Sequence, residues 1–376
     1  MAHLSCQRSV LVIQRLCALD GLFFWRASVT SKHALVTGAY GIVGLNVIKE
    51  LQTRGDWSVL AIGRREKPPL PDLAYVRADL LDPQATQDAL ADAGHCTHLF
   101  FGAFQYLPDP YEESALNVAI LRNTLDALRP AGAPLKQVLI CEGSKAYGAL
   151  MGPMRTPAKE RDPRVPGPLY YYDQEDMLWE RSAREGFATT ILRPDFIAGI
   201  GFGSYTNVVT VVAIYATMCK ALGLPLHFPG NAAAYGMLFQ MTDARLLARG
   251  MIWAAETQSD RNEIYNITNG DLFRWSNAWP RVARYFDLEV GQTLNIDLPL
   301  FMRDKGPLWA ELVRKHGLAL PLEKMINWAH GRNVGPPYEI HTSTVKIRQA
   351  GFHECLDTED RLFELFEEMR NRRLIP

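Results

Sequence analysis

Short apolar runs alternate with longer segments of helical period through the first two thirds of the chain. An apolar run at 34–36 leads into a glycine-rich turn and then into apolar residues at helical spacing, and a second run covers 57–62. Further strands are predicted at 75–77, 99–101, 137–141, 189–192 and 263–268, with helices from Pro83 and over 117–128. This alternation predicts an α/β fold, a Rossmann-like doubly wound parallel sheet.

Two stretches depart from the alternation, and they predict a second lobe. We expect residues 201–237 and 271–376 to form a smaller, mostly helical substrate-binding lobe. Ligands bind beyond the carboxyl ends of the strands in such sheets, so the lobe is expected to lie there. The nucleotide-binding domain is expected to span 29–200 and to regain a strand near 263–268.

Three other segments carry local signals. The apolar run 208–219 is too short to cross a bilayer and predicts a buried helix. Residues 152–168 contain five prolines and predict a loop near the ligand site. In residues 1–28, arginines interrupt the apolar runs, which argues against a signal peptide or a membrane span. We expect a disordered extension or a start codon placed too early there, and the scarcity of acids leaves a weak similarity to a mitochondrial presequence.

The turn after the first strand predicts a dinucleotide site. It reads Thr37-Gly38-Ala39-Tyr40-Gly41-Ile42-Val43-Gly44, a GxxGxxG spacing between a strand and a helix. Glycines let the backbone approach a pyrophosphate, and the helix N-terminus supplies free N–H groups. The alternative is a structural turn without a ligand. The residues assigned to the nucleotide here are Gly38, Tyr40, Gly41, Ile42, Val43 and Gly44.

The residues after the second strand favour NADP(H) over NAD. An NAD site usually places Asp or Glu there to bind the ribose hydroxyls, whereas this chain has Gly63-Arg64-Arg65. Guanidiniums can bind a 2′-phosphate through bidentate contacts. Alternatively, Arg64 and Arg65 are solvated residues of an edge turn.

Further nucleotide contacts are expected after the third and fourth strands. Asp79 and Leu80 stand where an adenine meets such a sheet, although Asp79 can equally be a loop aspartate. Small residues around Ala103 would let the nucleotide pass close over the backbone.

Composition excludes several classes of function. A formal net charge of -1 and a hydrophobic content of 48% give no support for a nucleic-acid or anionic-membrane partner. The six cysteines form no CxxC pair, which suits a reducing, cytoplasmic location. The segment His95-Cys96-Thr97-His98 leads directly into a strand and has no second ligand set at zinc spacing, so we expect no metal.

The candidate chemistry follows the fifth strand. The chain reads Gly143-Ser144-Lys145 there and, after the proline-rich loop, Tyr170-Tyr171-Tyr172-Asp173-Gln174-Glu175-Asp176. Short-chain dehydrogenases usually pair a tyrosine with a lysine four residues later, but Glu175 and Asp176 follow these tyrosines instead. The nearest candidate cation is Lys145, which the sheet would aim into the crevice.

These motifs resemble the progesterone 5β-reductase and iridoid synthase-like family, called PRISE, an atypical branch of the extended short-chain dehydrogenases. That family keeps a lysine in a Gly-x-Lys-like turn and a tyrosine in a Phe-Tyr-Tyr-x-x-Glu-Asp-like segment. Further similarity lies in residues 117–128, 228–230, 269–275 and 302–309, and the resemblance covers about 32–376.

The resemblance implies NADPH-dependent 1,4-reduction of an enone or enal, with Tyr171 and Lys145 as catalytic residues. Tyr171 would hold the enolate oxygen, and the Lys145 ammonium would favour the ionised phenol. The family also implies a backbone contact of Ile197 with the nicotinamide and a substrate contact of Asn207. Alternatively, Asn207 caps the helix from Val208, Tyr171 is a packing aromatic, and Lys145 is a solvated loop residue.

Two positions depart from the family. Phe104 stands where many plant members have tryptophan, and Tyr235 lies near another usual tryptophan. Both positions shape the pocket, with Phe104 a candidate substrate contact, so steroid or iridoid specificity is not carried over.

Three hypotheses follow: an ene-reductase, a carbonyl reductase or epimerase-like enzyme, and a non-catalytic NADP(H)-binding protein. The expected partner is a small-molecule enone or enal, and a homodimer is an open expectation.

Overall fold

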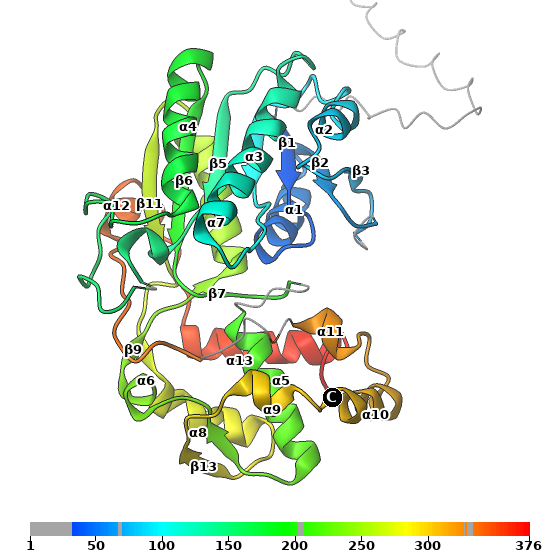
Figure 1. Ribbon diagram of the computed structural model, residues 1–376, viewed down its shortest axis with the longest axis vertical. Coiled ribbons are helices and arrows are strands. Elements are labelled where there is room, and N and C mark those ends of the chain that lie inside the picture. Colours follow the sequence, from blue (N-terminus) through cyan, green and yellow to red (C-terminus); the bar gives the residue numbers. More distant parts are fainter. Residues whose placement is uncertain (1–31, 67–69, 150, 202–206, 327, 329–333) are drawn as a thin grey trace, which may run out of the picture.

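A seven-stranded parallel sheet forms the upper half of the molecule in Figure 1, in the order β11-β6-β5-β4-β1-β2-β3. The computed structural model describes residues 32–66, 70–149, 151–201, 207–326, 328 and 334–376, so the predicted extension over 1–28 lies outside the described residues. The strands are β1 (Lys32–Thr37), β2 (Trp57–Gly63), β3 (Ala74–Arg77), β4 (His98–Phe101), β5 (Gln137–Cys141), β6 (Ala188–Pro194) and β11 (Glu263–Ile267).

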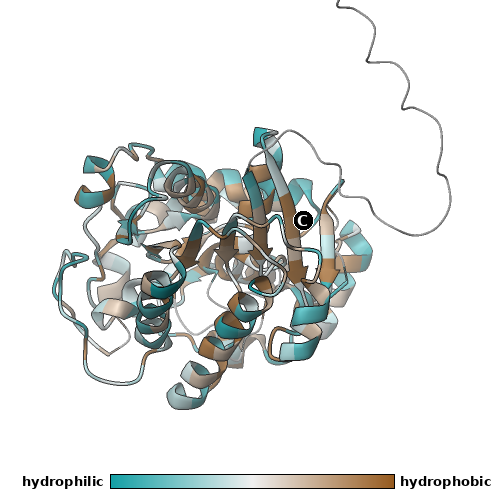
Figure 2. Ribbon diagram, turned by 90° about the horizontal axis from the view of Figure 1, so that it is seen from above, coloured by the Kyte–Doolittle hydropathy of each residue, from teal (hydrophilic) through white to brown (hydrophobic). Residues whose placement is uncertain are grey.

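Helices cover both faces of this sheet, which confirms the predicted doubly wound fold. The helices α1 (Ile42–Arg54) and α7 (Ala244–Thr257) pack together over one face. On the other face lie α2 (Pro83–Ala89), α3 (Pro110–Leu128) and α4 (Tyr170–Glu185). Figure 2 shows hydrophobic strands between helices whose outer faces are hydrophilic, as expected for a sheet buried on both sides.

The helix predicted over 117–128 begins seven residues earlier, at Pro110. The Asp109 side chain accepts hydrogen bonds from the N–H groups of Tyr111 and Glu112, and Pro110 occupies the first turn, where its missing N–H costs nothing. The polar first turns hid this start from the hydrophobic pattern.

The lower half of the molecule is mostly helical and has its own core (Figure 1). Its helices are α5 (Val208–Leu222), α6 (Ala232–Gly236), α8 (Trp275–Tyr285), α9 (Leu298–Met302), α10 (Gly306–His316), α11 (Leu322–Met325) and α13 (Thr358–Asn371), with short strands β8 (Leu226–Phe228) and β13 (Val290–Thr293). Trp275, Trp279 and Trp309 are buried in it, and each indole N–H donates to a backbone carbonyl. The large rings therefore bury their area without leaving a donor unpaired.

Short elements join the two halves. The pairs are β7 (Ile197–Ala198) with β10 (Thr242–Asp243) and β9 (Leu238–Phe239) with β12 (Phe273–Arg274). The helix α12 (Val345–Gln349) packs against β11, beside the sheet. The exact division of the chain into domains stays a prediction.

Two local predictions are met. Every residue of α5 from Val208 to Cys219 is buried, as the apolar run predicted. The proline-rich segment 152–168 forms no helix or long strand, and its Ala158 exchanges backbone hydrogen bonds with His341 and Ser343. Within the described part of the chain, no helix is both long and apolar enough to cross a membrane.

Candidate active site

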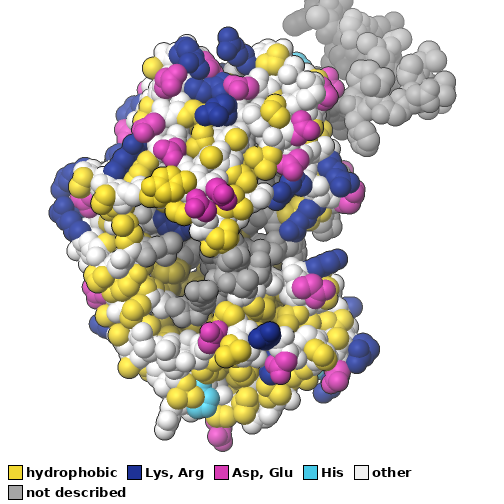
Figure 3. Space-filling view, viewed as in Figure 1, with side chains coloured by type: hydrophobic (Ala, Val, Ile, Leu, Met, Phe, Trp, Pro, Cys, Tyr) yellow, Lys and Arg dark blue, Asp and Glu magenta, His cyan; other side chains and the backbone are white. Residues whose placement is uncertain are grey.

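A cavity of about 750 Å³ lies at the carboxyl ends of the central strands. The upper and lower halves of the molecule, drawn as a space-filling view in Figure 3, both contribute residues to this cavity. Fourteen of the residues predicted to form the site line this cavity: Gly38, Tyr40, Gly41, Ile42, Val43, Arg64, Arg65, Asp79, Leu80, Ala103, Phe104, Lys145, Tyr171 and Ile197. Gly44 and Asn207 are not among its lining residues.

The glycine turn brings the backbone of β1 close to that of β4. Gly38 has a φ of +68°, and a Cβ there would lie 2.4 Å from the Gly102 carbonyl oxygen. A Cβ at Gly44 would lie 2.4 Å from the Gly38 carbonyl oxygen, so Gly44 serves the packing of α1 on the turn. Gly41 is the N-cap of α1 and has no side chain to bond the first N–H groups. These donors are therefore positioned for an anion.

Two guanidiniums stand beside this turn, after β2. Arg64 donates to the Gln105 side-chain oxygen at 2.9 Å, and the Arg65 guanidinium lies 5.6 Å from the centre of the Tyr40 ring. Neither arginine forms an ion pair with a carboxylate among the described residues, whereas the nearby Arg77 pairs with Glu66 at 2.5 Å. Both cations thus stay free to meet an anionic ligand.

The other predicted nucleotide contacts lie along the same side of the cavity. Asp79 is exposed and accepts the Leu81 N–H at 3.1 Å, while Leu80 is buried. The N–H groups of Gly102 and Ala103 both donate to the Thr37 hydroxyl at 3.1 Å. This ties the end of β4 to the end of β1 and places the small residues Gly102 and Ala103 in the cavity lining between Phe101 and Phe104.

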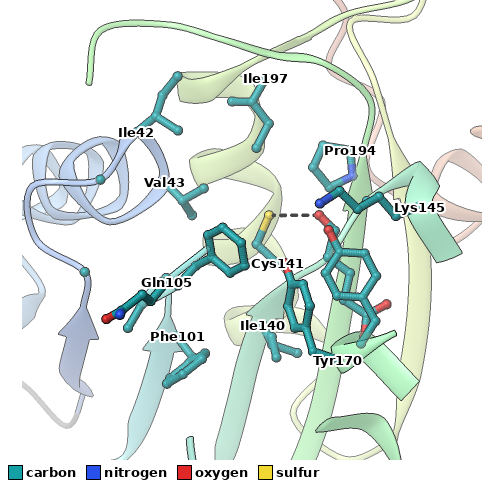
Figure 4. A pocket seen from close by; sticks show the side chains of 18 of the residues that line it. Ile42, Val43, Phe101, Gln105, Ile140, Cys141, Lys145, Tyr170, Pro194 and Ile197 are labelled. Carbon is teal, nitrogen blue, oxygen red and sulfur yellow. Dashed lines mark hydrogen bonds between the residues drawn. The ribbon is translucent and has the colours of Figure 1, made fainter. Parts of the chain in front are cut away.

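Lys145 and Tyr171 enter the cavity from two separate elements. Lys145 lies in the 3₁₀ turn Ser144–Tyr147 directly after β5, and Tyr171 lies in the first turn of α4. The Tyr171 hydroxyl sits against Gly143, where a Cβ would come within 3.3 Å of it. Figure 4 shows Lys145 and Tyr170 together with Pro194 at one end of the cavity.

Burial governs the protonation of this pair. Burial lowers the pKa of Lys145, although the charge of the Glu113 carboxylate partly offsets this change. Burial also raises the pKa of Tyr171 well above its ordinary value. The pKa of Tyr171 thus changes in the direction opposite to that expected from a nearby ammonium alone, because removing the phenol from water has the larger effect. Tyr171 is therefore a neutral phenol at physiological pH, suited to donate a hydrogen bond.

Comparisons with known proteins identify the family. The sequence model of the PRISE-like Rossmann-fold domain matches residues 77–331. The chain belongs to the PRISE family. Among its relatives, the (S)-8-oxocitronellyl enol synthase CYC2 of Camptotheca acuminata is 31% identical over 91% of this chain and 93% of its own length. The (S)-8-oxocitronellyl enol synthase ISY1 of Nepeta cataria is 32% identical over 78% of this chain and 80% of its own length.

Solved structures agree on the fold of this PRISE member. The UDP-glucose 4-epimerase of Thermus thermophilus, in complex with NAD, has a TM-score of 0.63 at 18% identity and covers 90% of this chain and 99% of its own. A short-chain dehydrogenase/reductase superfamily protein of Agrobacterium tumefaciens with bound NAD has a TM-score of 0.63 at 19% identity. The match covers 91% of this chain and 98% of that protein. At such identities the likeness shows the Rossmann-type fold alone, while the enol synthase relatives show that this is a family of enzymes.

The PRISE segment around Tyr171 is anchored by a buried ion cluster that sequence reasoning missed. Arg193, at the end of β6, donates to Glu142 at 2.8 Å, to Glu175 and to the Tyr147 hydroxyl at 3.2 Å. Glu175 also accepts from Arg164 at 2.6 Å. The acid that stands in place of the usual lysine therefore fixes α4 to the sheet. A signal was present, because Glu142 and Arg193 directly border apolar strands.

Asn207 and Ile197 occupy different surroundings. Asn207 is fully buried at the N-cap of α5, where its amide donates to the Gly199 carbonyl at 2.5 Å and its oxygen accepts the Thr210 N–H at 3.5 Å. This matches the capping alternative. Ile197 lines the cavity, and its strand β7 pairs with β10.

The rest of the cavity is mainly apolar. Phe104 stacks on Tyr170, with ring centres 5.2 Å apart and an interplanar angle of 27°. The cavity's apolar residues include Ala149, Phe196, Val208, Val211, Pro336, Pro337, Tyr338 and Ile340, and the polar Gln105, Ser144 and Gln174 also line it. Residues 335–340 belong to the predicted substrate-binding lobe, although the sequence did not single them out as lining residues. Hydrogen bonds from Tyr338 to Ala149 and from Thr342 to Asp195 hold this part of the chain in place.

Proposed function

We propose that this enzyme uses NADPH to reduce the activated C=C bond of an apolar α,β-unsaturated aldehyde or ketone. The observation that carries the proposal is the placement of Tyr171 and Lys145 in one cavity with the glycine turn and with two guanidiniums that have no carboxylate partner among the described residues. The membership of the PRISE family and its enol synthase relatives support it.

The residues present fit NADP(H). The first-turn N–H groups of α1 would hold the pyrophosphate, and Arg64 and Arg65 would hold the 2′-phosphate. Asp79 would accept from the adenine amine, and the backbone at Ile197 would meet the carboxamide. When bound, the reduced nucleotide supplies a hydride.

The chain's own task is to stabilise the charge that the hydride addition creates. A new C–H bond at the β-carbon pushes the C=C π electrons toward the α-carbon and the carbonyl oxygen, giving an enolate. Tyr171 donates a hydrogen bond to this oxygen, and such a donor is worth roughly 3 to 4 kcal/mol. One solvent proton completes the saturated product. The Lys145 ammonium adds positive potential beside the oxyanion, and the apolar wall keeps water away.

The distribution of charge disfavours an epimerase acting on nucleotide sugars. The charged side chains among the lining residues are Arg64, Arg65, Asp79, Glu142 and Lys145. The first three follow β2 and β3, at the nucleotide end, and Glu142 is bound by Arg193. Lys145 is then the one cation that the described lining offers to a substrate, too little for a second diphosphate.

Product analysis tests the proposal. NADPH oxidation is measured with 2-cyclohexen-1-one, an acyclic enal and a saturated aldehyde. We expect saturation of C=C bonds, with kcat about 100-fold lower in Tyr171→Phe because one oxyanion donor is lost. Tyr172→Phe is the matched control, since its hydroxyl donates to the Ala146 carbonyl at 2.8 Å and does not line the cavity.

Other outcomes would redirect the assignment. Alcohol products would identify a carbonyl reductase in which the same phenol protonates an alkoxide. Tight NADPH binding without turnover of any compound would favour a nucleotide-binding protein without catalysis.

A further inference from the structure

The helix α4 brings a further polar side chain to the cavity, one turn after Tyr171. Gln174 lines the cavity and is only 2% exposed. Its amide nitrogen donates to the backbone carbonyl of Asn117 at 3.0 Å, and because a carbonyl can only accept, this bond fixes which end of the amide is the oxygen. Among the residues that the structure describes, none donates a hydrogen bond to that oxygen. A buried acceptor without a donor is costly, so this oxygen is suited to meet a ligand.

The depth of Gln174 points to the nucleotide rather than to the substrate. The helix α4 begins at the carboxyl ends of the strands and leads back to the start of β6, so Gln174 lies one turn closer to the body of the sheet than Tyr171. Ile140, within β5, also lines the cavity, which therefore reaches down to the strands. Nucleotides cross the ends of the strands in folds of this type, whereas the second lobe covers the opposite side of the cavity.

The chemistry of the nucleotide selects the group that Gln174 meets. Held as proposed above, NADP(H) runs from the two arginines after β2, past the first turn of α1, to the reacting end at Tyr171. Gln174 borders the later part of this course, because its partner Asn117 also exchanges hydrogen bonds with the backbone of Gln105 after β4, at 2.8 and 2.9 Å. The pyrophosphate offers only acceptors, which an amide oxygen would repel. The ribose that carries the nicotinamide offers hydroxyl donors.

We propose that the Gln174 side-chain oxygen accepts a hydrogen bond from a hydroxyl of the ribose that carries the nicotinamide. The inference rests on the proposed function, in that it takes NADP(H) as the cofactor. Gln174 and Tyr171 are three residues apart on one face of α4. A single helix therefore holds both the ribose and, through Tyr171, the substrate oxygen, which fixes the nicotinamide relative to the substrate.

Nucleotide binding tests the inference without any turnover. Calorimetric titrations use NADP⁺, 2′-phospho-ADP-ribose, which lacks the nicotinamide, and 2′,5′-ADP, which also lacks the second ribose. Gln174→Met should weaken the binding of the first two about 3- to 10-fold, the effect of one hydrogen bond, and leave that of 2′,5′-ADP unchanged. Gln137→Met is the matched control, since Gln137 is also buried with an unbonded oxygen but does not line the cavity. It should leave all three affinities unchanged.

Several outcomes would overturn the inference. They are unchanged binding of NADP⁺ by Gln174→Met, weaker binding of NADP⁺ alone, which would indicate a contact with the nicotinamide instead, and no binding of NADP⁺ by the wild type. The failure of the proposed function would appear separately, in the product analysis.

A loss of 2′,5′-ADP binding in Gln174→Met would indicate a damaged fold, and the wild type then decides the matter. It is titrated with two NADP⁺ analogues that lack either the 2′- or the 3′-hydroxyl of the nicotinamide ribose. At least one analogue should bind about 3- to 10-fold more weakly than NADP⁺. Equal binding of NADP⁺ and both analogues would contradict the inference.

Discussion

At the scale of single residues, we expect Arg64 and Arg65 to set the choice of nucleotide. Charge-assisted hydrogen bonds contribute about 1.5 to 3 kcal/mol each, so Arg64→Ala and Arg65→Ala should each weaken NADPH binding about 10- to 100-fold. NADH lacks the phosphate, and its binding should be unchanged. Fluorescence titration measures both dissociation constants. Arg54→Ala is the control because Arg54 pairs with Glu256 at 2.9 Å outside the cavity lining. Equal losses for NADH and NADPH would argue against a 2′-phosphate contact.

A second residue-scale prediction concerns Asp195, which is fully buried and accepts a hydrogen bond from Thr342 at 3.0 Å. Burial raises the pKa of this carboxyl from 3.8 to about 7, with the Ser144 and Thr342 hydroxyls opposing the rise. Between these values the folded protein holds a proton that the unfolded chain has lost, so stability falls as the pH rises.

Urea unfolding at several pH values measures this effect. The free energy of unfolding of the wild type, measured relative to that of Asp195→Asn, should fall by up to about 4 kcal/mol between about pH 4 and pH 7. Above pH 7 the difference between the two proteins should stay constant. A difference independent of pH would show that the folded and unfolded pKa values are equal.

At the scale of elements, the Arg193 cluster attaches α4 to the sheet and thereby places Tyr171. Arg193→Met would leave Glu142 and Glu175 buried without this partner, and Arg193 itself is almost fully buried. Breaking a buried pair in this way costs about 3 to 5 kcal/mol of unfolding free energy. Arg184→Met removes exposed pairs with Glu180 and Glu185 on the same helix and should leave the unfolding free energy nearly unchanged. Similar losses in the two variants would mean that the cluster is not a main anchor of α4.

At the scale of the whole molecule, the cavity lies between the two halves, so a bound nucleotide should couple to global stability. A ligand that binds only the folded state adds about 2.7 kcal/mol to the free energy of unfolding when its concentration is 100 times its dissociation constant. We expect NADP⁺ to raise the melting temperature more than NAD⁺ at equal concentration. Differential scanning fluorimetry measures both shifts, and a larger shift with NAD⁺ would contradict the assignment of Arg64 and Arg65.

The sequence alone determined the features that depend on local pattern. Alternating strands and helices predicted the doubly wound sheet, and the glycine spacing predicted the turn at Gly38 that meets β4. The motifs at Lys145 and Tyr171 indicated the PRISE family, which the comparisons confirmed. These signals lie within a few residues of one another, where backbone geometry and hydrophobic period are set by nearest neighbours.

Only the tertiary structure decided which distant groups share a surface. It joined Arg193 to Glu142 and Glu175, set Tyr170 beside Tyr171 and Phe104, and turned Asn207 into a helix cap. It also brought residues from the segment 335–340 to the cavity wall. Such contacts arise from packing between elements far apart in the chain, and no periodicity encodes them. Burial, which sets the protonation of Tyr171 and Asp195, is likewise a property of the assembled fold.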